Sequence, residues 1–257
     1  MGERTSHAPG TFSWVDLGTP DADSAKRFYG ELFGWELTGE PAGPGNTYTV
    51  ARVDGSTVCA LYERRADLGT PAWLSYITVE SAEETALRAG ELGGSIIQPS
   101  FDVMDAGRMA LLSDPSGAMF GIWQPNLGIG AELVNDPGAL CLNQLNTDNP
   151  EAAQTFYKEL FGWTVEYNGT DAGDYWGLYN DGTLNGGLMP LPPEADAPPH
   201  WLVYFTVSDL DRSVAQIAKE LDGQIFVQPM KIESGRIAVA ADQQGAVFAM
   251  FEGEVDP

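Results

Sequence analysis

An internal repeat constrains the fold of this 257-residue chain more than any other feature. Residues 28–35 (FYGELFGW) return 128 positions later as residues 156–163 (FYKELFGW), with one difference in eight positions. A repeat of this length predicts two copies of one unit, each with the size of an ordinary domain. Further pairs at the same shift are Thr19 and Thr147, Trp73 and Trp201, Tyr76 and Tyr204, Asp114 and Asp242, and Phe120 and Phe248.

Each half has the pattern of a strand, a helix and further strands, and this pattern occurs twice. Apolar residues alternate over 12–17, and helical spacing follows from Ala22 to a stop at Gly34, with β-type runs at 47–53 and 57–62. The pattern restarts with a strand over 73–79 and a helix over 81–92, opened by the capping box Ser81-x-x-Glu84. Strands near 95, 109 and 119 complete it. The sequence therefore predicts four βαβββ modules.

The domain boundaries follow from this repeat and from composition. We expect residues 1–10 to form a flexible tail and residues 11–125 the first domain. Residues 126–138, which are rich in Gly, Asn and Pro, are expected to link it to a second domain at 139–253.

The charge balance excludes two classes of partner. The chain has 37 acidic and 13 basic residues, for a formal net charge of -24, and the acidic residues are spread along the sequence. Such a surface repels nucleic-acid phosphates and anionic lipids, so we expect neither nucleic acid nor membrane as a partner. Cys59 and Cys141 have no metal-ligand spacing, and the first ten residues lack the apolar core of a signal peptide. We expect a cytoplasmic monomer or homodimer that binds a small molecule.

The combined motifs resemble the vicinal oxygen chelate superfamily, which includes glyoxalase I, bleomycin-resistance proteins and extradiol dioxygenases. The resemblance rests on the acidic turn before the first helix, the FYxxxFGW helix end and the run DPSGAMFG at 114–121, and it extends over both halves. It implies an α+β fold of tandem glyoxalase-like domains, in which four βαβββ modules form two curved mixed-sheet half-barrels. It does not by itself imply one activity.

In this superfamily a divalent metal is usually held by His, Gln or Glu on the first strand of each module and by Glu on the last strand. At the matching positions this chain has apolar side chains or glycine, and the strands around Cys59 and Leu188 offer no carboxylate. The chain has only two histidines, His7 in the expected tail and His200. We therefore expect neither a metal nor another cofactor. The matching positions are Trp14, Leu74, Gly121, Leu142, Leu202 and Ala249.

Strand alternation then indicates which side chains face the two clefts, because residues of one parity share one face of a sheet. The candidate ligand-binding residues are Trp14, Asp16, Tyr76 and Trp123 in the first half and Gln144, His200 and Tyr204 in the second. Phe12, Ala72, Met119, Val247 and Phe251 have the same parity, whereas Val15, Leu17, Ile77 and Val79 are expected to pack on the helices.

Several side chains have two possible roles. The aromatic residues and Asp16 suit a planar or cationic small molecule, or they form a filled core with Asp16 bonded to the backbone. His200 is a candidate general base, with Asp16 as a second candidate catalytic residue, or it is a packing residue. Arg108 and Arg236 are expected to pair with Asp114 and Asp242, or to bind a ligand anion.

Three functions fit these residues. The first is a metal-independent small-molecule binding protein, like the bleomycin-resistance branch, with its ligand in an aromatic cleft. The second is a glyoxalase-type lyase or dioxygenase-type enzyme with a site that the superfamily does not use. The third is an interaction protein whose clefts have closed.

Overall fold

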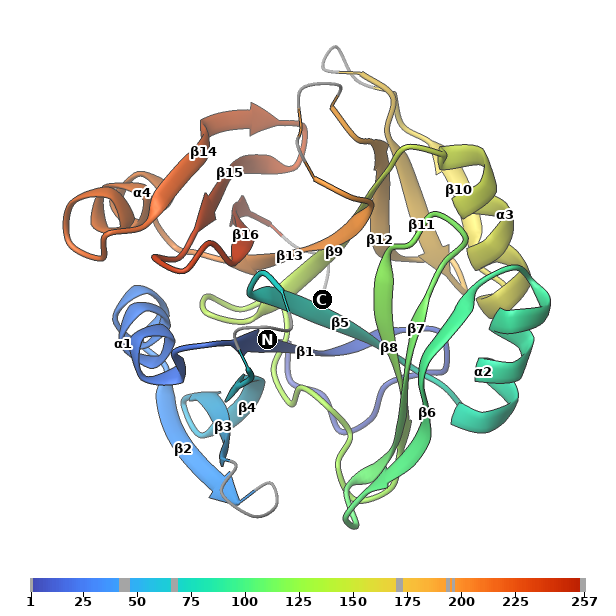
Figure 1. The fold of residues 1–257 in the computed structure, drawn as a ribbon. Helices are drawn as coiled ribbons and strands as arrows, with labels where there is room; N and C mark the ends of the chain where they lie inside the picture. Colours follow the sequence, from blue (N-terminus) through green and yellow to red (C-terminus); the bar gives the residue numbers. More distant parts are fainter. Residues whose placement is uncertain are drawn as a thin grey trace.

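The chain forms two mixed sheets of eight strands, one from each half (Figure 1). The computed structural model describes residues 2–41, 47–65, 69–169, 173–192, 195 and 197–254. The first sheet contains β1 (Phe12–Thr19), β2 (Glu36–Pro41), β3 (Thr47–Val53), β4 (Ser56–Glu63), β5 (Ala72–Thr78), β6 (Ser95–Val103), β7 (Gly107–Ser113) and β8 (Met119–Pro125). The second contains β9 (Leu140–Thr147), β10 (Thr164–Tyr167), β11 (Trp176–Asn180), β12 (Thr183–Pro190), β13 (His200–Thr206), β14 (Gln224–Ile232), β15 (Gly235–Ala241) and β16 (Val247–Gly253).

The strand order confirms that two modules pair within each half. The first sheet runs β2-β3-β4-β1-β5-β8-β7-β6, with β1 antiparallel to β5 at the join between modules. The second sheet repeats this order as β10-β11-β12-β9-β13-β16-β15-β14. Each sheet curves into a half-barrel, so the expected α+β fold of tandem glyoxalase-like domains is confirmed.

The helices begin and end where the sequence predicts. The Asp21 side chain accepts from the backbone N–H of Ser24 at the start of α1, and Gly34 ends that helix with φ 72°. Asn149 and Gly162 do the same for α3, and Ser81 caps α2. The helices are α1 (Ala22–Phe33), α2 (Ala82–Glu91), α3 (Pro150–Phe161) and α4 (Leu210–Lys219).

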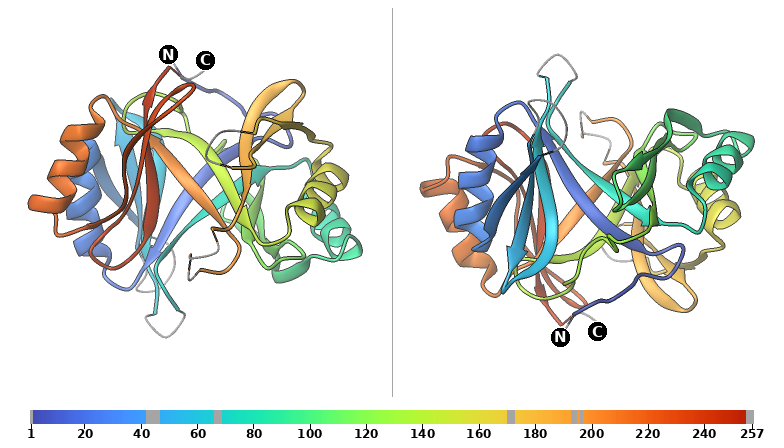
Figure 2. Two further views of the ribbon diagram at one scale, coloured as in Figure 1. Left: turned by 90° about the horizontal axis from the view of Figure 1, so that it is seen from above. Right: turned by 90° about the horizontal axis from the view of Figure 1, so that it is seen from below.

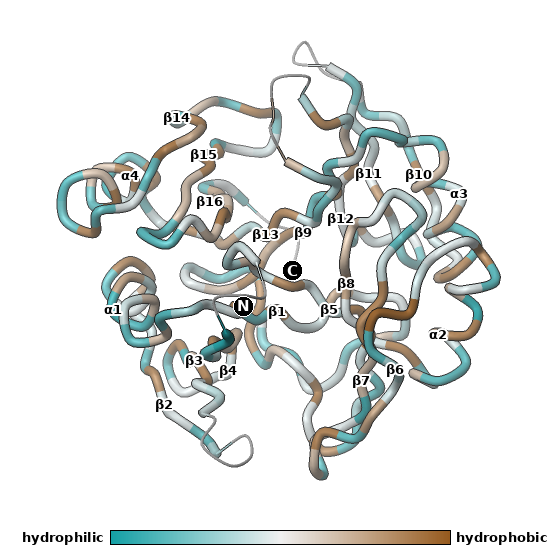
Figure 3. The backbone as a smooth tube through the Cα atoms, in the orientation of Figure 1, coloured by the Kyte–Doolittle hydropathy of each residue, from teal (hydrophilic) through white to brown (hydrophobic). Residues whose placement is uncertain are grey.

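The helices pair across the two halves. In Figures 1 and 2, α1 lies beside α4 on one side of the molecule, and α2 lies beside α3 on the other. The helices alternate between hydrophilic and hydrophobic residues in Figure 3, as expected of helices that bury one face. One helix-side core joins the first module to the fourth, and a second joins the second module to the third. Each half therefore completes the cores of the other.

A repeated hydrogen-bond chain crosses between the halves in these cores. The indole N–H of Trp73 donates to the hydroxyl of Tyr29 (3.1 Å), which donates to Asp242 of the other half (3.3 Å). The equivalent chain in the second core runs from Trp201 through Tyr157 to Asp114 at 3.0 and 3.3 Å. The two aspartates that the sequence places in turns are thus interdomain acceptors.

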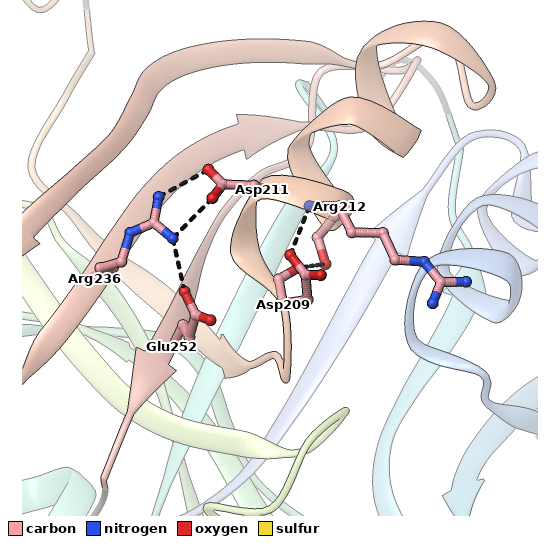
Figure 4. Close-up of polar contacts among 6 residues, drawn as sticks. Asp209, Asp211, Arg212, Arg236 and Glu252 are labelled. Atoms are coloured by element: carbon pink, nitrogen blue, oxygen red, sulfur yellow. Dashed lines mark hydrogen bonds and ion pairs between the residues drawn. The ribbon is translucent and has the colours of Figure 1, made fainter.

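The expected pairing of Arg108 with Asp114 and of Arg236 with Asp242 is wrong. Arg108 pairs with Asp102 across the β6–β7 hairpin at 2.9 Å. Figure 4 shows the guanidinium of Arg236 between Asp211 at the start of α4 and Glu252 of β16. Both turn aspartates are instead occupied by backbone N–H groups of their own turns and by the tyrosines. Asp114 accepts from Ser116 and Ala118, and Asp242 accepts from Gln244 and Ala246.

The N-terminal residues, expected to form a loose tail, contact the segment between the domains. Glu3 forms a β-bridge with Leu133, and the ring of His7 bonds to the carbonyl of Ala131 at 2.7 Å. Gly10 accepts from the indole N–H of Trp163 in the second half at 2.8 Å. Residues 2–10 are therefore held by hydrogen bonds to both the linker and the second domain. Across the described ranges, no helix combines the length and apolar character needed to span a membrane.

Candidate functional site

Four side chains from three strands form a hydrogen-bonded network on the face of the first sheet opposite the helices, which we call the inner face. The hydroxyl groups of Tyr48 and Tyr76 both donate to Oδ2 of Asp16, at 3.0 and 3.1 Å. The indole N–H of Trp14 donates to the hydroxyl oxygen of Tyr48 at 2.8 Å. The network brings together Trp14, Asp16 and Tyr76, as the sequence predicts, and adds Tyr48.

The carboxyl group of Asp16 is buried and only half satisfied. The residue is 4% exposed, and its Oδ1 atom is buried without a hydrogen-bond partner in the part of the chain that the structure describes. Burial raises the pKa of Asp16 from 3.8 to about 7, and the two tyrosine hydroxyls oppose that rise. Trp14 and Tyr48 are half-buried, so the network extends from the surface to the carboxyl group.

A β-bulge sets which residues of β1 reach the inner face. The register with β5 shifts between Phe12 and Trp14, so that Trp14 pairs with Tyr76 but Phe12 pairs with Ile77. Phe12 therefore points to the helices, where its ring lies 4.9 Å from that of Trp201. Its predicted place in the cleft is wrong. The four residues expected to pack on the helices, Val15, Leu17, Ile77 and Val79, do so.

Tyr76 occupies the place of the last-strand metal ligand. It pairs with Gly121 of β8, and a Cβ atom at position 121 would lie 2.2 Å from Cδ1 of the tyrosine ring. The ring thus lies directly over a glycine that leaves room for it. Any larger residue at position 121, including a metal-binding carboxylate, would displace Tyr76.

Trp123 lies on the same strand, β8, but outside the Asp16 network. It pairs with Thr78 and Met109, and its indole N–H donates to the carbonyl of Gly128 at 2.8 Å. It is half-buried. The described hydrogen bonds do not connect Trp123 to Asp16. Its indole bond instead holds the backbone of the segment that follows β8.

The second domain has a neutral amide at the equivalent position. Gln144 stands 128 residues after Asp16, and its Oε1 atom accepts from the hydroxyl of Tyr204 at 2.9 Å, as Asp16 accepts from Tyr76. Beside Gln144 this inner face also holds an apolar cluster. Its buried members are Leu202, Tyr204, Ala249 and Phe251.

A hydrogen-bond chain continues from Gln144 to His200. Nε2 of Gln144 donates to Oδ1 of Asn146 at 2.9 Å, and Nδ2 of Asn146 lies 3.2 Å from Nε2 of His200. Nδ1 of His200 lies 2.8 Å from the carbonyl of Pro198. Both ring nitrogens thus have protein partners. His200 and Asp16 also belong to different sheets, so the structure does not assemble the candidate catalytic pair.

The residues present do not fit the metal that the superfamily usually binds. Among the described residues no group of three His, Cys, Asp or Glu side chains lies close enough to hold an ion. The buried carboxyl group of the first inner face, on Asp16, is already bonded to two hydroxyls. Cys59 and Leu188 belong to the helix-side cores and so point away from the inner faces. One carboxyl group without a neighbouring imidazole or second carboxylate does not make the set of ligands that such sites use.

Tyr48, Tyr62 and Asn146 are site residues that the sequence reasoning missed. The strands that carry the two tyrosines were predicted, and alternation along those strands could have placed both side chains on the inner face. In the structure Tyr48 pairs with Tyr62 across β3 and β4. Their rings stack with centroids 6.1 Å apart. Asn146 lies two residues after Gln144 on β9 and therefore shares its face.

The comparisons with known proteins agree on the fold. A family model described as Glyoxalase/Bleomycin resistance protein/Dioxygenase superfamily matches residues 11–122 and 140–250. The protein CFP32 of Mycobacterium tuberculosis (strain CDC 1551 / Oshkosh), named as a glyoxylase, is 39% identical over 98% of both chains. The anthracycline biosynthesis protein DauV of Streptomyces sp. (strain C5) is 34% identical over 96% of this chain and 95% of its own. The Mn(II)-bound glyoxalase of Novosphingobium aromaticivorans has a TM-score of 0.69 and 18% identity, covering 96% of this chain and 84% of its own, and shows the shared fold alone.

Proposed function

Because this chain belongs to the glyoxalase/bleomycin resistance protein/dioxygenase superfamily, we propose that it is a metal-independent small-molecule binding protein. The ligand lies against the inner face of the first domain, beside Trp14, Asp16 and Tyr76. The observation that carries this proposal is the buried carboxyl of Asp16, which has an oxygen without a partner among the described residues and is bonded to the half-buried Tyr48 and the buried Tyr76. A buried polar atom without a partner is costly unless something pairs with it.

Two further observations support the proposal. The donor set of the first inner face suits hydrogen bonding and ring contacts rather than ligation of a divalent ion. The named relatives, a glyoxylase and a protein of anthracycline biosynthesis, point to small organic molecules as the class of ligand.

The test is a ligand screen on protein treated with a chelator. Thermal shift and tryptophan fluorescence are measured with aldehydes, thiol adducts, catechols and cationic aromatic drugs. At least one class is expected to stabilise the metal-free protein, and Trp14→Ala is expected to weaken its binding about tenfold or more. Leu142→Ala, at the equivalent position of the second domain, is the matched control and is expected to leave affinity within about twofold.

A requirement for added Fe, Mn, Ni or Zn would overturn metal independence, as would stoichiometric metal in the purified protein. The burial of Asp16 and Tyr76, both 4% exposed, favours one other candidate, an interaction protein whose clefts have closed. The same screen separates the two, because a closed cleft binds none of these compounds.

A further inference from the structure

We infer that Asp16 is a hydrogen-bond donor, a neutral carboxylic acid that recognises a carbonyl or phenolic oxygen on a planar ring. This inference rests on the proposed function and deepens it by naming the class of ligand. It is carried by the geometry of Asp16 and by comparison with the equivalent site of the second domain.

The first step concerns the two carboxyl oxygens of Asp16. Both tyrosine hydroxyls donate to Oδ2, whereas Oδ1 is buried without a partner in the described part of the chain. This is the pattern of a carboxylic acid, in which the carbonyl oxygen accepts and the other oxygen carries the proton. An ionised carboxylate would leave half of its charge buried without a donor, which is costly.

The second step is the internal comparison that the duplication provides. In the second domain Gln144 is neutral, and its oxygen accepts from a tyrosine while its N–H donates to Asn146. A protonated Asp16 has the same polarity: its oxygen accepts from Tyr76, and its O–H is available to donate. The two domains thus differ in the donor's partner: the N–H of Gln144 donates to Asn146, whereas Oδ1 of Asp16 has no partner among the described residues.

The third step is the acceptor that the first domain lacks. Gly18 stands at the position of Asn146, and Ala72 stands at the position of His200. The same strand register pairs Gly18 with Ala72 and Asn146 with His200. The chain that satisfies Gln144 is therefore missing its next members, and the donor of Asp16 is left for a ligand oxygen.

The fourth step concerns the shape of the ligand. Tyr62 lies beside the missing position, since a Cβ atom on Gly18 would be 2.9 Å from its hydroxyl. The rings of Tyr48 and Tyr62 are stacked and half-buried, so they present aromatic surface next to Asp16. A planar ring packs well on such a surface. An oxygen on that ring can then accept from Oδ1.

Among the described residues around Asp16, no other side chain is expected to change its charge near neutral pH. The titratable groups that share the inner face with Asp16 are Tyr48 from β3, Tyr62 from β4 and Tyr76 from β5, and Cys59 of β4 lies behind them in the helix-side core. Burial raises the pKa of each of these four groups. No ion pair within the described ranges involves Asp16. The nearby guanidinium of Arg64 donates to backbone carbonyls of residues 69 and 70. Asp16 is then the group whose charge changes near pH 7.

The test compares two probes with one ring skeleton, 1-indanone with a carbonyl and 1-aminoindane with an ammonium group. Wild-type protein is expected to bind 1-indanone, with affinity falling about 30-fold from pH 6 to pH 8.5 as Asp16 ionises with a pKa of about 7. Asp16→Asn keeps a donor N–H, so its affinity should stay within about twofold over that range. Asp54→Asn makes the same charge change in an exposed turn and should keep the wild-type profile.

A second readout needs no ligand. In the NMR spectrum of protein labelled with ¹³C at aspartate carboxyl carbons, the signal that disappears in Asp16→Asn belongs to Asp16. At pH 6 the chemical shift of this signal should be that of a protonated carboxyl group. An ionised Asp16 at pH 6, or preference for 1-aminoindane that Asp16→Asn abolishes, overturns the inference and identifies an anionic site. Failure of both 1-indanone and the catechols, while another compound of the screen binds, also overturns the inference but leaves the proposed function intact. A protein that binds nothing in the screen overturns both.

Discussion

Replacing Asp16 with asparagine should change how the stability of this protein depends on pH. Burial raises the pKa of Asp16 from 3.8 to about 7, so between these values the folded protein holds a proton that the unfolded chain has released. This group is therefore most favourable to folding below pH 4, and its contribution is lost as pH rises to 7. One pH unit is worth about 1.4 kcal/mol, so about three units give a loss of about 4 kcal/mol.

The Asp16→Asn variant cannot ionise and resembles the protonated acid. Its side-chain oxygen can accept from Tyr48 and Tyr76, as Oδ2 does in the native protein. At pH 4.5, about 0.7 pH unit above 3.8, the variant should be more stable by only about 1 kcal/mol. At pH 8 the variant should be more stable by up to about 4 kcal/mol, or about 8–16 °C in Tm for a chain of this size.

The assay is urea unfolding, followed by tryptophan fluorescence, at intervals from pH 4.5 to 8.5. Other carboxyl groups titrate in both proteins, so the difference between them isolates Asp16. Asp54→Asn serves as the control, since residue 54 is exposed in a turn with φ 49°, a conformation that asparagine tolerates. A stability difference that stays constant with pH, or a native protein favoured at pH 8, would refute the reasoning.

Three other predictions test the interdomain cores and the Tyr76 contact. Tyr29→Phe removes the hydroxyl between Trp73 and Asp242 and should cost about 1–3 kcal/mol in urea unfolding. Lys26→Ala in the same helix removes only an ion pair with the exposed Asp23 and should cost under about 0.5 kcal/mol. Equal losses would contradict the role of the Tyr29 bond. Gly121→Ala should cost about 1–3 kcal/mol in unfolding free energy because its Cβ would lie 2.2 Å from the ring of Tyr76. A neutral effect would show that this ring moves freely. Ala249→Gly makes the reverse change at the equivalent position of the other domain. Residues 1–125 expressed alone should lack cooperative unfolding by circular dichroism and regain it on mixing with residues 126–257, since each core draws on both halves; independent folding of either piece would refute this.

Much of the fold could be predicted because its signals are local. The caps at Asp21 and Ser81, the glycine stop at Gly34 and the strand alternation each depend on residues close in sequence. The repeat then fixed the number of modules. Parity also placed Trp14, Asp16 and Tyr76 on one face, where the structure joins Asp16 to Tyr76 by a hydrogen bond.

The predictions fail where sheet register, or a contact with a residue distant in sequence, determines the direction or the partner of a side chain. The bulge before Trp14 reverses the face of Phe12, and alternation cannot reveal an extra residue in a strand. Arg108 is paired by its cross-strand neighbour Asp102, not by the aspartate next in the motif. The partner of Tyr29 lies 213 residues away, so spacing within one half could not indicate it.

The cores shared between the two halves also affect how such a protein can evolve. Two identical chains joined through the same cores would carry every substitution twice, once in each inner face. Here both copies are encoded in one chain, so one can change while the other keeps the contacts that hold the pair together. The aspartate at position 16 and the glutamine at the equivalent position 144 are one such difference between the two halves. Under the proposed function, this arrangement would let one inner face bind a ligand while the other keeps the contacts that hold the scaffold together.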